Sequence, residues 1–151
     1  MNSKILCLFL LILAATTISC DTAKQATNSY TGALKAGNDA AVVSAIRNIQ
    51  SAEVQYMATH EDEFGTFDQL VANGNLDSRF SGTSPVVGHY TFSLKLTPKS
   101  GSTASGYALN ADPQPAPGDP QATGAHYYTD SNSSSIRSNK TASAGPKDPV
   151  I

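Results

Sequence analysis

The chain has 151 residues, and its 10 Lys and Arg against 12 Asp and Glu give a formal net charge of −2. The basic residues are scattered singly along the sequence, which argues against the basic stripe of a nucleic-acid-binding protein. The two cysteines are Cys7 and Cys20. Because Cys7 lies in a segment that we expect to be removed, the mature chain has no internal disulfide and no thiolate metal site. We therefore expect no nucleic-acid partner, no cofactor, and a domain stabilised by an ordinary apolar core.

The first 19 residues have the pattern of an export signal. A single cation, Lys4, precedes an apolar run over residues 5–15. This run is too short for a permanent membrane helix, since a hydrocarbon core of about 30 Å needs about 20 residues at 1.5 Å each. Ser19, a small residue, stands directly before Cys20.

This junction resembles the lipobox of bacterial lipoproteins, although Thr17 stands where that pattern prefers Leu. The resemblance implies cleavage after Ser19 and a lipid on Cys20. It also implies a cell-envelope location, with the chain anchored to a membrane and facing the periplasm or the exterior. Several acyl chains on one residue hold a protein stably to a bilayer. The alternative is an ordinary secretory signal cut near the same point, which leaves Cys20 as a free thiol.

Residues 20–38 are small and polar with little apolar periodicity, so we expect the lipidated cysteine to be followed by a flexible tether. The alternative is a weak helix through the alanines of this segment. From residue 39 the pattern changes, and apolar residues recur at spacings of three and four to about residue 60. This period predicts an amphipathic helix over about 39–60, with Asn38 as its cap. A second, short helix is predicted over about 66–73, where Thr66 and Gln69 form the pattern of a capping box.

The second half of the chain predicts a small antiparallel sheet of three or four strands. Residues 90–97 alternate apolar and polar side chains, and residues 107–111 repeat the alternation after a turn-rich stretch. A proline-rich block over residues 112–120 is incompatible with a central strand, and two shorter strands are expected at 125–129 and 135–138. The tail over residues 139–151 is polar and is predicted to be disordered. The fold class is therefore α+β, with one globular domain over 39–138.

The order of these elements resembles the globular part of bacterial type IV pilins and type II secretion pseudopilins. The segments that carry the resemblance are residues 45–56, 64–70, 88–92, 107–113, 127–130 and 136–137. In that family a helix packs across a three- or four-stranded antiparallel sheet. The family's long apolar amino-terminal helix is missing from residues 21–38, so we expect a membrane-anchored relative that does not polymerise by the pilin route. The resemblance implies partners among pilus or secretion proteins.

Candidate functional residues are few. Asp112, Asp119 and Asp130 are weak calcium candidates, because pseudopilins carry a calcium site in their carboxy-terminal loops and carboxylate oxygens suit this ion. Tyr127 and Tyr128 are neighbours on a strand, so one of them must point outward. Tyrosine is favoured at binding surfaces, and the outward one is the candidate contact residue.

The sequence contains neither the Gly-x-Ser-x-Gly motif nor the Ser-x-x-Lys motif, both of which mark a nucleophilic serine. The leading hypothesis is therefore a non-catalytic structural or interaction module of the cell envelope. The rival is a ligand-binding lipoprotein, or a small enzyme whose site is assembled from distant residues such as His89, His126 and Asp130. If the strands that carry the two histidines pair directly, these side chains approach each other.

Overall fold

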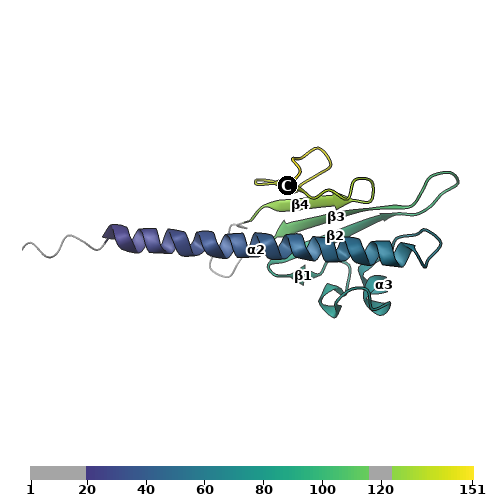
Figure 1. Ribbon diagram of the computed structural model, residues 1–151, viewed down its shortest axis with the longest axis horizontal. Helices are drawn as coiled ribbons and strands as arrows, with labels where there is room; N and C mark the ends of the chain where they lie inside the picture. Colours follow the sequence, from purple (N-terminus) through teal and green to yellow (C-terminus); the bar gives the residue numbers. More distant parts are fainter. Residues whose placement is uncertain (1–19, 116–123) are drawn as a thin grey trace, which may run out of the picture. The chain divides into compact units, whose positions relative to one another are not determined.

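A computed structural model describes residues 20–115 and 124–151 of the chain. The chain divides into two units, residues 1–36 and 37–151, and the packing described below is that of the second. Figure 1 shows its layout, in which α2 covers one face of a sheet. The elements are α2 (Cys20–Met57), α3 (Phe67–Ala72), the 3-10 helix η1 (Ser78–Phe80), β1 (Val86–Val87), β2 (Tyr90–Thr97), β3 (Gly106–Pro113), β4 (His126–Asp130) and β5 (Arg137–Asn139).

The α+β class is confirmed, but the sheet has five strands rather than three or four. The strands follow one another in the order β1-β2-β3-β4-β5, and every neighbouring pair is antiparallel. The additional strand is β1, whose Val87 pairs with Tyr90. Gly88 and His89 join β1 to β2, and both have positive φ (59° and 67°), as the two central residues of a type I′ hairpin turn require. His89 therefore lies in a turn and not on a strand, as the sequence analysis expected.

The long helix also differs from its prediction. α2 begins at Cys20 and ends at Met57, so residues 20–38 are helical rather than a flexible tether, and Asn38 lies within the helix instead of capping it. Alanine recurs through this polar stretch and proline does not occur in it. High alanine propensity therefore favours a helix that apolar periodicity did not reveal. Within the described ranges, no helix is both long enough and apolar enough to cross a membrane.

The core forms between α2 and the sheet. The predicted apolar stripe of the helix is confirmed, since Val42, Ile46, Ile49, Ala52 and Tyr56 are all buried. These side chains join one apolar cluster with residues of the sheet and of the segments between α2 and β2. Those other buried residues are Phe67, Leu70, Leu76, Phe80, Tyr90, Phe92, Tyr107, Leu109, Ala111, Tyr127 and Ile136.

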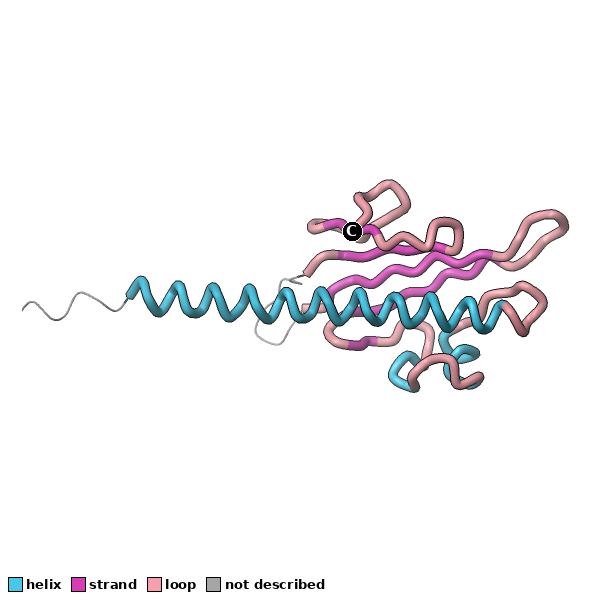
Figure 2. Tube along the Cα trace, viewed as in Figure 1, coloured by secondary structure: helices cyan, strands magenta, loops and turns pink. Residues whose placement is uncertain are grey.

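The short helix α3 begins as predicted. Gln69 N donates to Thr66 Oγ1 over 3.3 Å, and Thr66 N donates to Gln69 Oε1 over 2.8 Å, which completes the capping box. Phe67 and Leu70 are the buried residues of α3. Further along the chain, Phe80 meets Phe92 of β2 edge to face, with 5.4 Å between the ring centroids. Figure 2 shows that β2 and β3 are the long strands of the sheet.

The carboxy-terminal residues are ordered, contrary to the prediction of a disordered tail over 139–151. Ser138 N donates to Pro149 O and Ile151 N donates to Ile136 O, so the end of the chain pairs with the edge of β5. Between these points Ala144 is buried, and its carbonyl accepts a hydrogen bond from Asn110 Nδ2 of β3 over 2.7 Å. The polar composition of this segment predicts disorder. It does not reveal that β3 carries polar groups to which the segment binds.

Candidate functional site

Four of the residues that the sequence analysis singled out, Asp112, His126, Tyr128 and Asp130, lie on the face of the sheet that points away from α2. Tyr127 is buried on the helix side, so His126 and Tyr128 of β4 point to the opposite face. The register places Asn110 of β3 opposite Tyr128, and Arg137 of β5 on its other side. This outer face therefore brings polar side chains from β3, β4 and β5 together.

The closest polar contact on the outer face joins Asp112 and His126. His126 Nδ1 lies 2.6 Å from Asp112 Oδ1, and both side chains are partly exposed. Ser143 Oγ, from the carboxy-terminal segment, donates to the second carboxylate oxygen, Oδ2, over 3.2 Å. One carboxylate thus holds both a histidine and a serine.

This arrangement does not match nucleophilic catalysis. In a Ser-His-Asp triad the imidazole lies between the hydroxyl and the carboxylate, so that it can take the proton of the hydroxyl. Here Asp112 lies between Ser143 and His126. The contacts instead attach the carboxy-terminal segment to β3 and β4, together with the hydrogen bonds of Asn110.

The direct strand pairing on which the rival site of His89, His126 and Asp130 depends does not form among the described strands. His126 begins β4 and His89 directly precedes β2. β3 lies between these two strands in the sheet, and strands two positions apart lie about 9 to 10 Å from each other. His89 also belongs to the β1–β2 turn. The histidines are therefore not brought to one point.

The two calcium candidates that the structure describes, Asp112 and Asp130, each have separate hydrogen-bond partners. Asp130 Oδ1 accepts hydrogen bonds from the backbone amides of Asn132 and Ser133, each over 3.0 Å, and Tyr128 Oη donates to its Oδ2 over 3.0 Å. Burial opposes ionisation of Asp130, but these hydrogen bonds outweigh it and lower the pKa of this carboxyl. Asp119 lies outside the described residues. Within residues 20–115 and 124–151, no group of three or more His, Cys, Asp or Glu is placed to hold a metal ion.

The two tyrosines have different environments. Tyr127 is buried, with its ring centroid 6.0 Å from that of Tyr90, and burial raises the pKa of its phenol to about 12. Tyr128 is partly exposed on the outer face, where burial and the hydrogen bond to Asp130 raise its pKa. Tyr128 is therefore the outward-pointing member of the pair, and it also fixes the β4–β5 turn through Asp130.

The structure identifies one titratable group that the sequence analysis did not single out. Glu53 lies on the apolar stripe of α2, one turn after Ile49, and its exposed fraction is 0%. Its Oε2 accepts a hydrogen bond from Gly65 N over 2.9 Å, whereas Oε1 has no hydrogen-bond partner among the described residues. Burial raises the pKa of this carboxyl to about 7, although the Gly65 hydrogen bond acts in the opposite direction. The signal in the sequence was a glutamate at helical spacing from Ile49 and Tyr56 on an otherwise apolar face.

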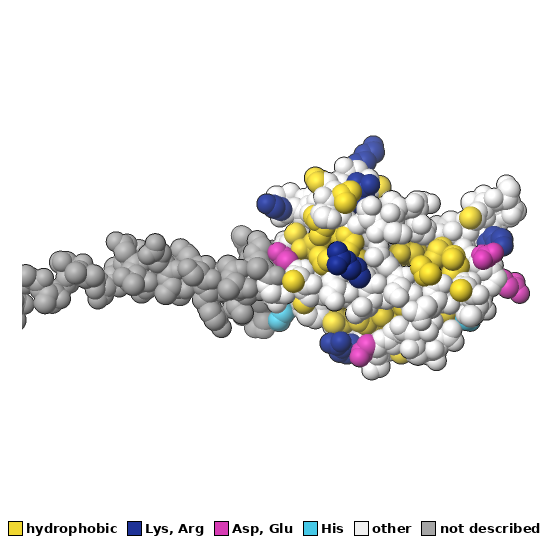
Figure 3. Space-filling model, viewed as in Figure 1, with side chains coloured by type: hydrophobic (Ala, Val, Ile, Leu, Met, Phe, Trp, Pro, Cys, Tyr) yellow, Lys and Arg dark blue, Asp and Glu magenta, His cyan; other side chains and the backbone are white. Residues whose placement is uncertain are grey.

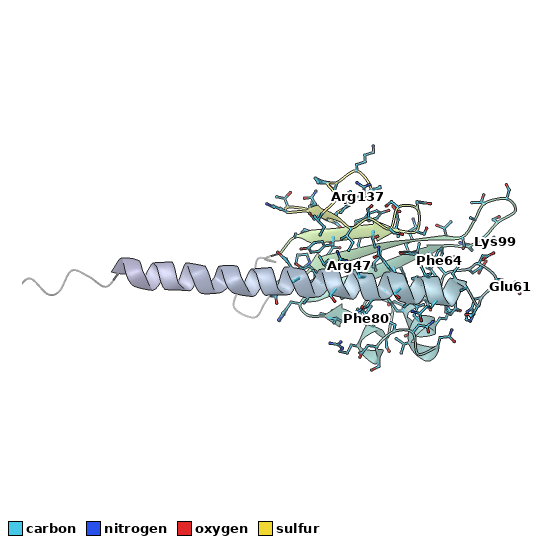
Figure 4. The ribbon with its side chains drawn as sticks, in the orientation of Figure 1. Arg47, Glu61, Phe64, Phe80, Lys99 and Arg137 are labelled. Atoms are coloured by element: carbon cyan, nitrogen blue, oxygen red, sulfur yellow. The ribbon has the colours of Figure 1, made fainter. Side chains whose placement is uncertain are left out.

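Charged groups elsewhere are dispersed. On the face drawn in Figure 3, the Lys and Arg side chains of the described part stand apart from one another. Figure 4 shows Arg47 on α2 and Arg137 near the carboxy terminus, well separated from Lys99 at the far end of the sheet. This distribution offers no continuous basic surface on the face shown.

Comparison with protein-family models, with characterised proteins and with solved structures finds no match to this chain. The resemblance to pilins therefore remains a prediction from the order of elements and from the segments named above.

Proposed function

We propose that this chain is a non-catalytic, lipid-anchored protein of the bacterial cell envelope, and that its pilin-like domain is a structural or interaction module. The observation that carries the proposal is the junction at Cys20. An apolar run of export-signal length over residues 5–15 is followed by Ser19, a small residue, which stands directly before Cys20. A thiol at this point is the nucleophile that lipid attachment requires.

The architecture supports a pilin-like domain. A helix whose apolar face covers one side of an antiparallel sheet is the arrangement that the resemblance implies, and here that helix precedes the strands in the sequence. The domain departs from the family where the amino-terminal residues of the helix are polar. We therefore expect the domain to bind pilus or type II secretion proteins from a membrane surface rather than to polymerise.

The environment of the candidate residues supports a non-catalytic role. Asp112 binds His126 and Ser143, and Asp130 closes the β4–β5 turn. Each of these carboxylates has a structural partner. Two of the groups that the rival hypothesis needs, His126 and Asp130, thus attach parts of the chain to one another.

Lipid attachment is tested by metabolic labelling with an alkyne fatty acid in a bacterium that processes lipoproteins. The wild-type chain should incorporate the label, and Cys20→Ala should not. Cys7→Ala is the matched control, because Cys7 lies within the segment to be removed and its loss should leave labelling intact. Labelling of Cys20→Ala at the wild-type level would refute the proposed anchor.

The interaction role is tested by chemical cross-linking of the anchored wild-type chain in intact cells of its own species. We expect pilus or secretion components among the cross-linked proteins. Recovery of none of these components, across conditions in which pili or secreted proteins are made, would contradict the proposed partners. It would leave the anchor, which the labelling experiment tests separately, unaffected.

A further inference from the structure

The buried carboxyl of Glu53 joins two parts of the chain that are 12 residues apart. Glu53 lies near the end of α2, whereas Gly65 lies near the end of the segment that joins α2 to α3, residues 58–66, which we call the 58–66 turn. The hydrogen bond from Gly65 N to Glu53 Oε2 is itself buried. Gly65 is also close-packed, since a Cβ on this residue would lie 3.1 Å from side-chain atoms of Tyr56 and Leu70. The end of the turn is therefore held against the helix by this one carboxyl and by close packing.

The 58–66 turn in turn contacts the loop between β2 and β3. Asp62 lies 3.9 Å from Lys99 Nζ, and its carbonyl accepts a hydrogen bond from Ser105 Oγ. Phe64 packs edge to face against Tyr107 at the start of β3, with 5.0 Å between centroids. Figure 4 shows Glu61, Phe64 and Lys99 at the same end of the sheet. The position of the turn thus determines the surface at this end of the domain.

Ionisation of Glu53 is costly while the turn is closed. A buried carboxylate needs several hydrogen bonds or an opposite charge to offset its lost hydration, and here Oε1 lacks a partner within the described ranges. The ion pairs of the described residues join other groups, namely Arg79 with Asp77, Lys99 with Asp62, and His126 with Asp112. Opening of the turn admits water to the carboxylate and removes this cost.

The other titratable groups near this site do not relieve the charge. Tyr107 faces Glu53 from β3, and burial together with the charges of Glu53 and Asp130 raises its pKa to about 12. The turn itself carries His60, Glu61, Asp62 and Glu63. His60 stacks on Tyr56 with 3.7 Å between centroids, and the three carboxylates are exposed. Glu53 is the buried acid of this end of the domain.

We propose that the Glu53 carboxyl is a proton-controlled latch, which holds the 58–66 turn closed against α2 when it is protonated and releases the turn when it is ionised. Release moves Phe64 and Asp62 away from the β2–β3 loop. The turn is therefore open for a larger fraction of the time above neutral pH than below it.

Amide hydrogen exchange of the full chain between pH 4 and pH 8 tests the latch, after correction for the pH dependence of intrinsic exchange. The opening equilibrium constant measured at the Gly65 amide should rise by up to about tenfold per pH unit between the ordinary carboxyl pKa and neutrality, and then level off. In Glu53→Gln, which keeps an acceptor for Gly65 but cannot ionise, the constant should not vary with pH. Glu63→Gln, which neutralises an exposed carboxyl of the same turn, is the control and should retain the wild-type profile.

Two results would overturn the latch. One is an opening constant that is independent of pH in the wild type, or equally dependent on pH in Glu53→Gln. The other is exchange of Gly65 only at the rate of the Leu109 amide in the core, because the turn would then open only in global unfolding. If Glu53→Gln does not fold, the ionisation of Glu53 can be followed in the wild type by NMR, from the chemical shift of its carboxyl carbon as the pH is changed. A midpoint near 7 supports the latch, and an ordinary carboxyl midpoint refutes it.

Discussion

Gln50 of α2 donates a hydrogen bond from its side-chain amide to Thr129 Oγ1 of β4, over 2.8 Å. The same nitrogen donates to Ser134 O, in the β4–β5 turn, over 2.9 Å. Thr129 is completely buried, so Gln50 satisfies a polar group within the core and connects the helix to the far half of the sheet. Both protons of one amide are used to attach α2 to a strand and to its turn.

The change Gln50→Ala should therefore lower the free energy of unfolding by about 1 to 3 kcal/mol, because it leaves a buried hydroxyl without its partner. Urea denaturation followed by circular dichroism measures this loss. Gln55→Ala is the control, since Gln55 donates to Ser51 on the exposed side of the same helix and its loss should cost less than about 0.5 kcal/mol. Equal effects of the two substitutions would contradict the assigned role of Gln50.

Two glycines of the domain should respond in opposite ways to a methyl group. Gly65→Ala places a Cβ about 3.1 Å from Tyr56 and Leu70, so it should destabilise the domain by about 1 to 3 kcal/mol. Gly37 lies in α2 with no atom within 4 Å of such a Cβ. Gly37→Ala should be neutral or stabilise by up to about 1 kcal/mol, because alanine favours the helix. Thermal unfolding of both variants, side by side with the wild type, measures the contrast.

If the carboxy-terminal segment is packed on the sheet, substitutions at its buried and exposed positions should have different effects. Ala144 is buried against the sheet, whereas Ala142 is exposed in the same segment. Ala144→Asp buries a charge without a partner and should detach the segment or lower stability by about 2 kcal/mol or more. Ala142→Asp should have little effect. Limited proteolysis with a carboxypeptidase reports detachment directly, and identical digestion of both variants and the wild type would show that the segment is not packed.

Global stability should depend on pH in two separate ranges. The raised pKa of Glu53 means that the folded chain holds a proton that the unfolded chain releases above about pH 4.5. Stability therefore falls as the pH rises from there towards 7, by up to about 1.4 kcal/mol per pH unit. Asp130 has a lowered pKa, so its contribution is present above its ordinary pKa of 3.8 and is lost as the pH falls further.

Unfolding free energies measured across this range should pass through a maximum in mildly acidic solution. Glu53→Gln should remove the decline on the neutral side and leave the acidic side unchanged. A curve that rises steadily to pH 7 in the wild type would show that Glu53 ionises normally.

Much of the fold follows from periodicity in the sequence. The stripe from Val42 to Tyr56 and the alternation in residues 90–97 are regular repeats with periods of 3.6 and 2, and the structure confirms both elements. The capping box at Thr66 is likewise a local pattern, and its hydrogen bonds form between residues three apart. Elements that depend on residues close together in the sequence could therefore be predicted from the sequence.

The features that the sequence did not reveal depend on distant contacts. Nothing in residues 140–151 indicates that Asn110 and Asp112 bind them. The two-residue strand β1 is too short for any pattern to show. Glu53 stands at helical spacing on the apolar stripe, but a glutamate is normally exposed. Its burial depends on the hydrogen bond from Gly65, which comes from another part of the chain. In the candidate site, the order of strands separates His89 from His126, and that order cannot be obtained from either segment alone.

The most direct test of the account is the mass of the mature amino-terminal peptide, taken from the native protein. We expect this peptide to begin at Cys20, to lack residues 1–19, and to carry the added mass of a diacylglycerol thioether and an amide-linked acyl chain. A peptide that still contains Met1, or one that begins near Cys20 without any lipid, would contradict the central claim that the domain is held at a membrane through this cysteine.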